Sequence, residues 1–183
     1  MILEDFIKRL RDNNPDLIAA DLTKETILDQ GKMLEILQAI KANTTLKTLK
    51  LDLGLQNTKE IFTSLTELIS SNKILQNLHL KKQFTDEELA LIIKALAQNN
   101  KLKELKIQGV HNDELTIGDQ TLKAISDTFT KSKNSLKTLG LNRVKFNAEK
   151  GREALELIGK AQLNSLNLDQ NKFDDVAIEN LLN

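Results

Sequence analysis

One pattern constrains this chain of 183 residues more than any other: a ladder of apolar residues that returns six times. Each copy follows Leu-x-x-Leu-x-Leu, with Ala or Ile in place of a leucine in two copies. The copies occupy residues 17–22, 46–51, 75–80, 102–107, 136–141 and 163–168, and their last positions are 29, 29, 27, 34 and 27 residues apart. The final positions of each ladder alternate apolar and polar residues, and this period of two predicts a half-buried strand.

Each ladder is followed by apolar residues at helical spacing, as at Ile61, Leu65, Leu68 and Ile69. This spacing predicts a helix whose apolar face covers the strands. A strand and a helix repeated every 27–34 residues are typical of a leucine-rich repeat solenoid. We therefore expect an α/β fold of about six repeats, with a curved parallel sheet on the concave face and helices on the convex face. Because each repeat buries its apolar face only against its neighbours, residues 1–183 are predicted to form a single domain.

Both ends of this solenoid are predicted to carry a capping helix, at residues 1–14 and 173–183, around repeats at 15–172. Such caps cover the apolar faces that terminal repeats would otherwise expose to water. In the second cap we expect Val176, Ile178, Leu181 and Leu182 to contribute to the covering face. The aromatic side chains at helical spacing are predicted to be buried; they are Phe6, Phe62, Phe129 and Phe173.

Several polar residues mark the ends of the predicted helices. Thr85 and Glu88 have the spacing of a capping box, in which each side chain bonds the other's backbone amide. Thr58 and Asn147 are predicted N-caps of two other helices. Asparagines at 43, 72 and 99–100 follow three helices, and we interpret them as residues that end a helix in the left-handed conformation.

Composition narrows the functional class. Basic and acidic residues number 26 each, so net charge does not favour a nucleic acid or a membrane surface as partner. The absence of cysteine excludes disulfides and thiolate metal sites. The N-terminus lacks the basic and apolar regions of a secretory signal, which predicts a cytoplasmic protein. We expect a monomer that uses no cofactor and no metal.

The polar positions between the ladder leucines are predicted to line the concave face. There Lys50, His79, Lys81 and Lys106 form a basic stripe, extended by the neighbouring pair Asn142 and Arg143. The functional interpretation is a docking face for an acidic protein, with charge steering association. The alternative is a solvated polar face that only keeps the protein in solution.

The fourth repeat offers a second candidate surface. Its passage from strand to helix, residues 109–118, is about six residues longer than that of the third repeat. Insertions in repeat proteins often lie on a binding face. The polar residues predicted to bind a partner in this loop are His111, Asp113 and Glu114.

Catalytic motifs are missing from the sequence. Neither His-Glu-x-x-His nor Gly-x-Ser-x-Gly nor a phosphate-binding glycine loop occurs. The preferred hypothesis is therefore a non-enzymatic module that binds a protein through its concave face or its repeat-four loop. An enzyme that uses His79 or His111 as an acid–base group is the alternative from another class.

Three segments carry a resemblance to a known family: Leu3–Leu17 (LEDFIKRLRDNNPDL), Ala39–Lys47 (AIKANTTLK) and Lys103–Ile107 (KELKI). They resemble leucine-rich repeats of the ribonuclease-inhibitor-like subclass and, within it, the capping domain of tropomodulin and leiomodin. The resemblance implies capping or nucleation of actin filaments, with actin as the partner. Relative to that family we expect the tropomyosin-binding N-terminal half to be absent and the final long helix to be shortened.

Lysine outnumbers arginine 22 to 4, and Asn and Ile are abundant, as in proteins from AT-rich genomes. This composition motivates a further hypothesis: a bacterial effector that binds a host protein in the host cytosol.

Overall fold

The computed structural model describes residues 3–24, 29–54, 58–110, 115–131, 135–146 and 149–182. Six parallel strands form the main sheet in the order β1-β2-β3-β4-β6-β8. Their bounds are β1 (Ala19–Leu22), β2 (Thr48–Asp52), β3 (Asn77–Lys81), β4 (Glu104–Gln108), β6 (Thr138–Asn142) and β8 (Ser165–Asn167). The α-helices are α1 (Leu3–Arg11), α2 (Gln30–Ala42), α3 (Lys59–Ser71), α4 (Asp86–Leu96), α5 (Asp119–Ile125), α6 (Glu149–Gly159) and α7 (Asp175–Leu182).

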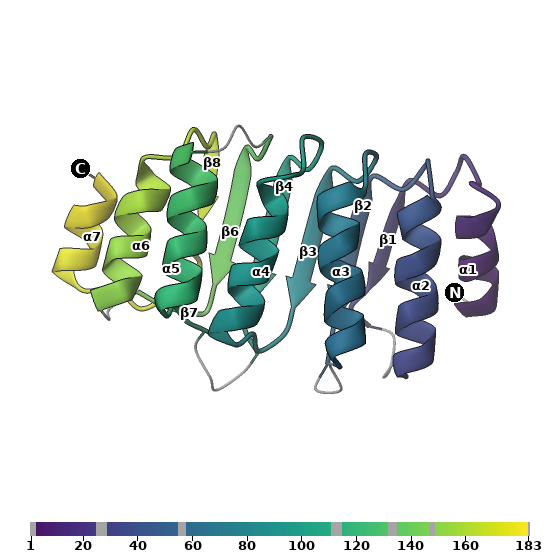
Figure 1. Cartoon of the computed structure of the whole chain (residues 1–183), viewed down its shortest axis with the longest axis horizontal. Helices are drawn as coiled ribbons and strands as arrows, with labels where there is room; N and C mark the ends of the chain where they lie inside the picture. The colour runs from purple at the N-terminus through teal and green to yellow at the C-terminus, as the bar shows by residue number, and fades with distance from the viewer. Residues whose placement is uncertain are drawn as a thin grey trace.

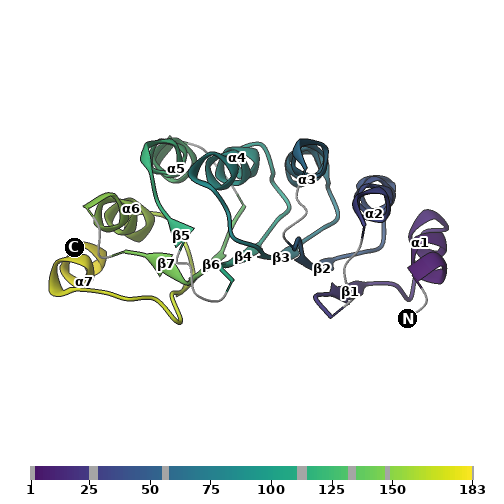
Figure 2. The same cartoon turned by 90° about the horizontal axis from the view of Figure 1, so that it is seen from below.

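Strands and helices alternate along the chain and form two layers (Figure 1). Seen along its edge, the molecule is an arc with the helices on the outer side and the sheet on the inner side (Figure 2). Every strand of the main sheet overlaps the final positions of a predicted ladder, and the register pairs equivalent positions, such as Leu49 with Leu78 and Leu78 with Leu105. The predicted leucine-rich repeat solenoid is confirmed.

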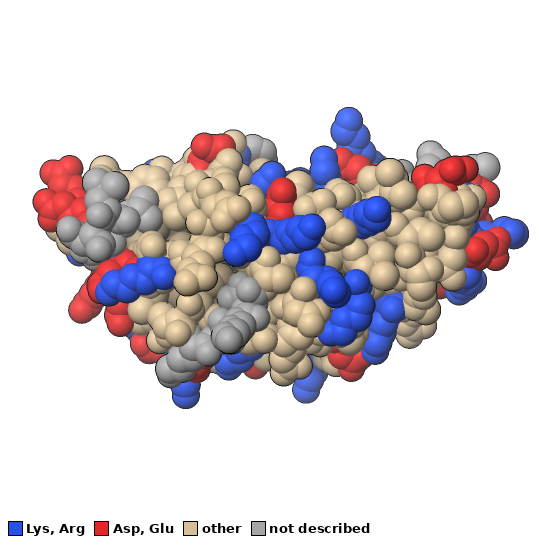
Figure 3. Space-filling view, turned by 90° about the horizontal axis from the view of Figure 1, so that it is seen from above, with Lys and Arg blue, Asp and Glu red and all other residues tan. Residues whose placement is uncertain are grey.

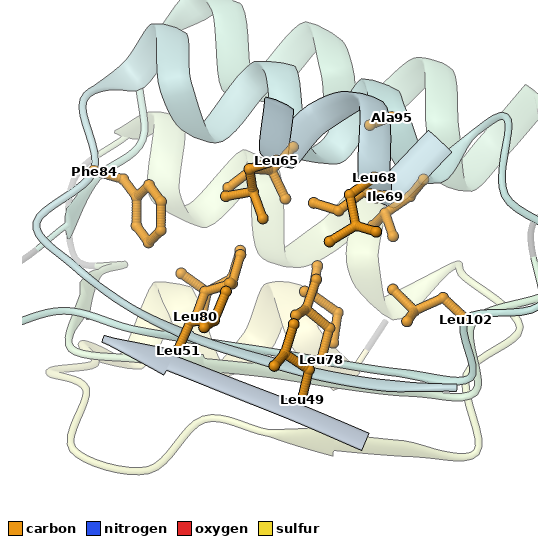
Figure 4. Packing of buried hydrophobic residues seen from close by; sticks show 14 of the residues in the cluster. Leu49, Leu51, Leu65, Leu68, Ile69, Leu78, Leu80, Phe84, Ala95 and Leu102 are labelled. Atoms are coloured by element: carbon orange, nitrogen blue, oxygen red, sulfur yellow. The ribbon is translucent and has the colours of Figure 1, made fainter. Parts of the chain in front are cut away.

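The core lies between the two layers. Leu49, Leu78 and Leu105 are fully buried on the face of the sheet that is turned toward the helices. The α3 residues Leu65 and Leu68 pack over Leu49 and Leu78 (Figure 4). Burial of one such leucine stabilises the fold by roughly 1.5–3 kcal/mol. The ladder leucines of β8, which are Leu163, Leu166 and Leu168, are only partly buried.

The aromatic predictions hold at three of four positions. Phe6, Phe62 and Phe129 are buried, whereas Phe173 is 36% exposed. The prediction for Phe173 was wrong because this residue precedes α7 rather than lying on its inner face. Its ring instead stacks on that of Phe146, with centroids 5.7 Å apart.

The predicted helix starts are confirmed where the structure describes them. At α4 the Thr85 hydroxyl accepts the Glu88 amide, and the Glu88 carboxylate accepts the Thr85 amide. Thr58 caps α3 by accepting the amide of Ile61. Asn147 lies outside the described residues.

Asn43, Asn72 and Asn99, which follow helices, have a different structural role from the predicted one. Asn43 and Asn72 have φ of −74° and −67°, so their backbones are extended and not left-handed. Their side chains are buried and connect neighbouring repeats. The amide of Asn43 donates to the Leu10 carbonyl, that of Asn72 to the Ile40 carbonyl, and that of Asn99 to the Ile69 carbonyl. We call these residues (43, 72 and 99) the asparagine ladder.

The second half of the sheet contains additional structure. A small parallel sheet pairs β5 (Leu115–Thr116), from the long passage of repeat four, with β7 (Val144–Lys145). Helix α5 continues as a π-helix, η1 (Ser126–Lys131). The insertion in repeat four thus places residues 115–116, between β4 and α5, beside residues 144–145, which follow β6.

Gly118 occupies the N-cap position of α5 and has no side chain that could cap the helix. The Asp86 carboxylate of α4 takes that role, accepting the amides of Gly118 at 2.8 Å and of Gln120 and Thr121 at 3.1 Å. Burial alone would raise the pKa of Asp86, but the hydrogen bonds from Thr121 and its neighbours outweigh it and hold the pKa below the ordinary value of 3.8.

The two terminal helices cover the sheet unequally. Helix α1 buries Phe6, Ile7 and Leu10 against the first repeat, as predicted. Helix α7 packs on α6 through the buried Ala177. Val176 and Ile178, which were predicted to belong to the covering face, are each 48% exposed, so that prediction was wrong. Within the described ranges, no helix is both long and apolar enough to cross a membrane.

Candidate protein-binding surface

The concave face presents the polar residues of the strands in rows that run across the sheet. One row contains Asp21, Lys50, His79 and Lys106, continued by Gly140 and Asn167. The next row contains Asp52, Lys81, Gln108 and Asn142. Neighbours within a row are one strand spacing apart, about 4.8 Å. The structure thus brings Lys50, His79, Lys81, Lys106 and Asn142 together on one face, as the sequence predicts.

These cations are not free, however. The Lys50 ammonium lies 3.3 Å from the Asp21 carboxylate on the preceding strand, and that of Lys81 lies 2.7 Å from Asp52. Lys106 and the His79 imidazole each approach the same oxygen of Glu104 at 2.7 Å. Each side chain of the predicted basic stripe that was named above therefore lies beside a carboxylate. The role of the stripe as a docking face stays a prediction.

Glu104 is the centre of the longest of these networks. It begins β4, one row away from His79 and Lys106, and its side chain is only a quarter exposed. The hydrogen bond from Lys106 is the largest cause that lowers its pKa; burial opposes this effect, and the bond from His79 reinforces it. Gly140, the neighbour of Lys106 in its row, leaves room for the lysine stem, which occupies the space a β-carbon would need.

Asn142 and Arg143 lie at the end of β6, where the main sheet meets the small one. Arg143 has a left-handed backbone with φ of 59°, and its Nε donates to the Gln170 side chain at 2.7 Å. The side-chain oxygen of Asn142 is buried and has no hydrogen-bond partner among the residues that the structure describes. Neither side chain therefore adds a freely exposed charge to the concave face.

The remaining candidates separate into two groups. His111, Asp113 and Glu114 lie outside the described residues, so their predicted role in the repeat-four loop is untested. His79 has the carboxylate neighbour that an acid–base residue needs, but no hydroxyl hydrogen-bonds it within the described ranges. Nor do three His, Asp or Glu side chains gather there as a metal site requires.

Sequence reasoning missed a second set of charges, at the edge of the sheet where helices lead into strands. Lys47, Lys103 and Lys137 directly follow the first leucine of their ladders, and Lys73 and Lys101 lie just before one. All five are exposed. The recurrent Leu-Lys pair in the sequence could have predicted this set, but the alternation of apolar and polar residues applies only to the strand positions that follow the pair.

Comparisons with known proteins agree with the architecture. No family model matches the sequence. Human tropomodulin-4 is 26% identical over 106 residues, which cover 57% of this chain and 30% of that protein. Rat leucine-rich repeat-containing protein 73 is 29% identical over 178 residues, which cover 94% of this chain and 54% of that protein. The chain thus spans about half, or less, of the length of these curated relatives.

Solved structures match over the whole chain. The C-terminal domain of tropomodulin from Caenorhabditis elegans superposes with a TM-score of 0.62 at 16% identity, covering 100% of this chain and 90% of that one. Leiomodin-1 actin-binding site 2 superposes with a TM-score of 0.58 at 17% identity, covering 100% and 88%. The predicted similarity to tropomodulin and leiomodin is confirmed, and the structural matches establish the shared fold.

Proposed function

We propose that this leucine-rich repeat domain, which has the fold of the tropomodulin C-terminal domain, is a non-enzymatic module that binds actin. The supporting observation is the match of the whole chain to a leiomodin-1 domain identified as an actin-binding site. Sequence similarity to tropomodulin-4 points to the same group of proteins. A cytoplasmic location follows from this proposal, because the partner is cytoplasmic.

The concave face is the surface we assign to this contact. It offers rows of half-exposed polar side chains across adjacent strands, above fully buried leucines that cannot take part in binding. Its lysine ion pairs can be exchanged for pairs with a partner without leaving a buried lysine charge uncompensated, because the side chains of Lys50, Lys81 and Lys106 are roughly two-fifths exposed. Such exchange gives specificity and orientation more than raw affinity.

The direct test is filament assembly. We expect micromolar protein to change the rate of pyrene-actin polymerisation or depolymerisation and to sediment with filaments. No change in either rate, together with no co-sedimentation, would remove actin as the partner. The fold and any other interaction would be unaffected by that result.

A charge swap tests the surface separately. Lys106→Glu breaks the pair with Glu104, whereas the double variant Glu104→Lys with Lys106→Glu keeps an ion pair and the net charge but moves the positive charge by one row. If the concave face binds actin, both variants lose the effect while the double variant retains the thermal melt. Wild-type activity in the double variant would contradict the assignment of this face.

The bacterial-effector hypothesis has no specific observation in its favour beyond the composition. It stays a prediction, as does the monomeric state.

A further inference from the structure

We propose that the edge where helices lead into strands is a docking surface for a short acidic segment of a partner protein. We call it the lysine edge and define it by Lys47, Lys73, Lys101, Lys103 and Lys137. This inference goes beyond the proposed function, because it concerns a different surface and does not require the partner to be actin.

Backbone hydrogen bonds set the spacing of this edge. The Lys47 carbonyl accepts the Gln76 amide at 2.8 Å, and the Gln76 carbonyl accepts the Lys103 amide at 2.7 Å. The Lys103 carbonyl in turn accepts the Lys137 amide at 2.8 Å. These residues therefore form one row with steps of about 4.8 Å, so that Lys47 and Lys137 lie roughly 14 Å apart at the backbone. An extended peptide covers that distance with about five residues.

The charges of this row are unpaired, in contrast to those of the concave face. None of the five lysines forms an ion pair or a side-chain hydrogen bond with any residue in the described part of the chain. Figure 3 views this edge and shows Lys and Arg gathered over its middle, with Asp and Glu more frequent toward the ends of the molecule. A chain with zero net charge thus has a local positive field that can steer an acidic partner.

The asparagine ladder holds the backbone of this edge. The Asn99 side-chain oxygen accepts the amides of Lys101 and Leu102, both at 2.7 Å. Asn72 does the same for Ile74 and Leu75 in the preceding repeat, at 2.8 and 2.7 Å. Because both asparagines are buried, the turns that carry Lys73 and Lys101 are pre-organised, which lowers the entropic cost of binding.

The first residue of the row indicates a protein partner. Ile18 occupies the position equivalent to Lys47, since its carbonyl accepts the Lys47 amide at 2.8 Å, and its side chain is 55% exposed. An acidic segment with an apolar residue at one end would satisfy both the lysines and Ile18. A nucleic acid is a poorer fit, because the row contains no arginine and no aromatic side chain on which bases could stack.

The test uses a fluorescein-labelled peptide of five glutamates with a leucine at one end, and fluorescence anisotropy as the readout. The edge variant carries Lys47→Glu, Lys103→Glu and Lys137→Glu in the full chain. The matched control carries Lys59→Glu, Lys94→Glu and Lys123→Glu, which are exposed on the helices and change the net charge equally. Thermal melts of both variants verify that they fold.

We expect salt-sensitive binding to the wild-type protein, an affinity at least about tenfold lower in the edge variant and a change below about twofold in the control. Ile18→Ser should weaken binding of the leucine-ended peptide but not of a peptide with glycine at that end. An absence of binding to the wild-type protein, or equal losses in both triple variants, would overturn the proposal. So would tighter binding of a single-stranded oligonucleotide of equal charge through the same lysines.

Discussion

The two halves of this solenoid use the same ladder but connect their repeats in different ways. From β1 to β4 the spacing stays at 27–29 residues, and a buried asparagine joins each repeat to the one before. Beyond β4 the spacing rises to 34 residues for one repeat and returns to 27 for the last, and the connection changes. There Thr128 reaches the Ile93 carbonyl, and Asn171 accepts the Val144 amide and donates to the Leu141 carbonyl.

In both halves the backbone groups between repeats need hydrogen-bond partners, but different residues supply those partners. Wherever a helix gives way to a strand, backbone groups are buried and need partners. In the regular half a single asparagine side chain meets that need. In the other half the Thr128 hydroxyl of the π-helix donates to the Ile93 carbonyl and the Ser135 hydroxyl donates to the Leu102 carbonyl. Asp86 and the small second sheet satisfy backbone groups at the opposite edge, where strands lead into helices. Three substitutions test how far the two halves differ.

The largest effect is expected in the regular half. Asn99→Ala removes four hydrogen bonds from a buried site, which join the Asn99 side chain to the carbonyls of Ile69 and Asn72 and to the amides of Lys101 and Leu102. We expect the free energy of unfolding to fall by about 3 kcal/mol in urea denaturation, since each buried unsatisfied group costs roughly 1–3 kcal/mol. The neighbouring Asn100 is exposed, so Asn100→Ala should change it by less than about 0.5 kcal/mol. Equal losses in the two variants would refute a special role for the asparagine ladder.

A smaller loss is expected from the irregular half. Gly151 in α6 packs so closely on the chain after β7 that a β-carbon would overlap the Lys145 carbonyl oxygen and lie 2.7 Å from the Phe146 Cα. Because both neighbours are backbone atoms, Gly151→Ala should lower the free energy of unfolding by about 2 kcal/mol. Gly31 in α2 meets only the Asp29 side chain, at 3.3 Å. There the substitution should be neutral or stabilising by up to about 1 kcal/mol, as alanine favours the helix. Similar thermal shifts for both variants would show that α6 can adjust its position.

The smallest of the three effects tests the link between α4 and α5. Asp86→Ala removes the only described side-chain cap of α5, so we expect a loss of about 1 kcal/mol at neutral pH. Because the folded-state pKa of Asp86 is lowered, its contribution is complete above the unfolded-state pKa and disappears as the pH falls through the folded-state value.

The stability difference between the wild-type protein and Asp86→Ala should therefore shrink on acidification below about pH 4. Urea denaturation of both proteins across this range measures that difference, and other carboxylates cancel in the comparison. A difference that stays constant with pH would assign the effect to packing instead of charge.

Much of the fold could be predicted because its signals are local. The period of two in each ladder determines which residues face the core, and the equivalent places of Lys50, His79 and Lys106 within their ladders put them in one row. The capping box at Thr85 and Glu88 spans four residues and was equally accessible. The predicted burial failed at Phe173, Val176 and Ile178, because burial there depends on how the last helix packs on its neighbour.

The sequence by itself determined the solenoid, its register and the composition of the concave face, since these follow from which residues must avoid water. Only the tertiary structure decided which charges are neutralised. Lys50 and Lys81 find carboxylates 29 residues away on the adjacent strand, whereas Lys47 and Lys103 find none among the described residues. Ion pairs and buried hydrogen bonds depend on distances of a few ångströms between repeats, and a one-dimensional pattern does not contain those distances.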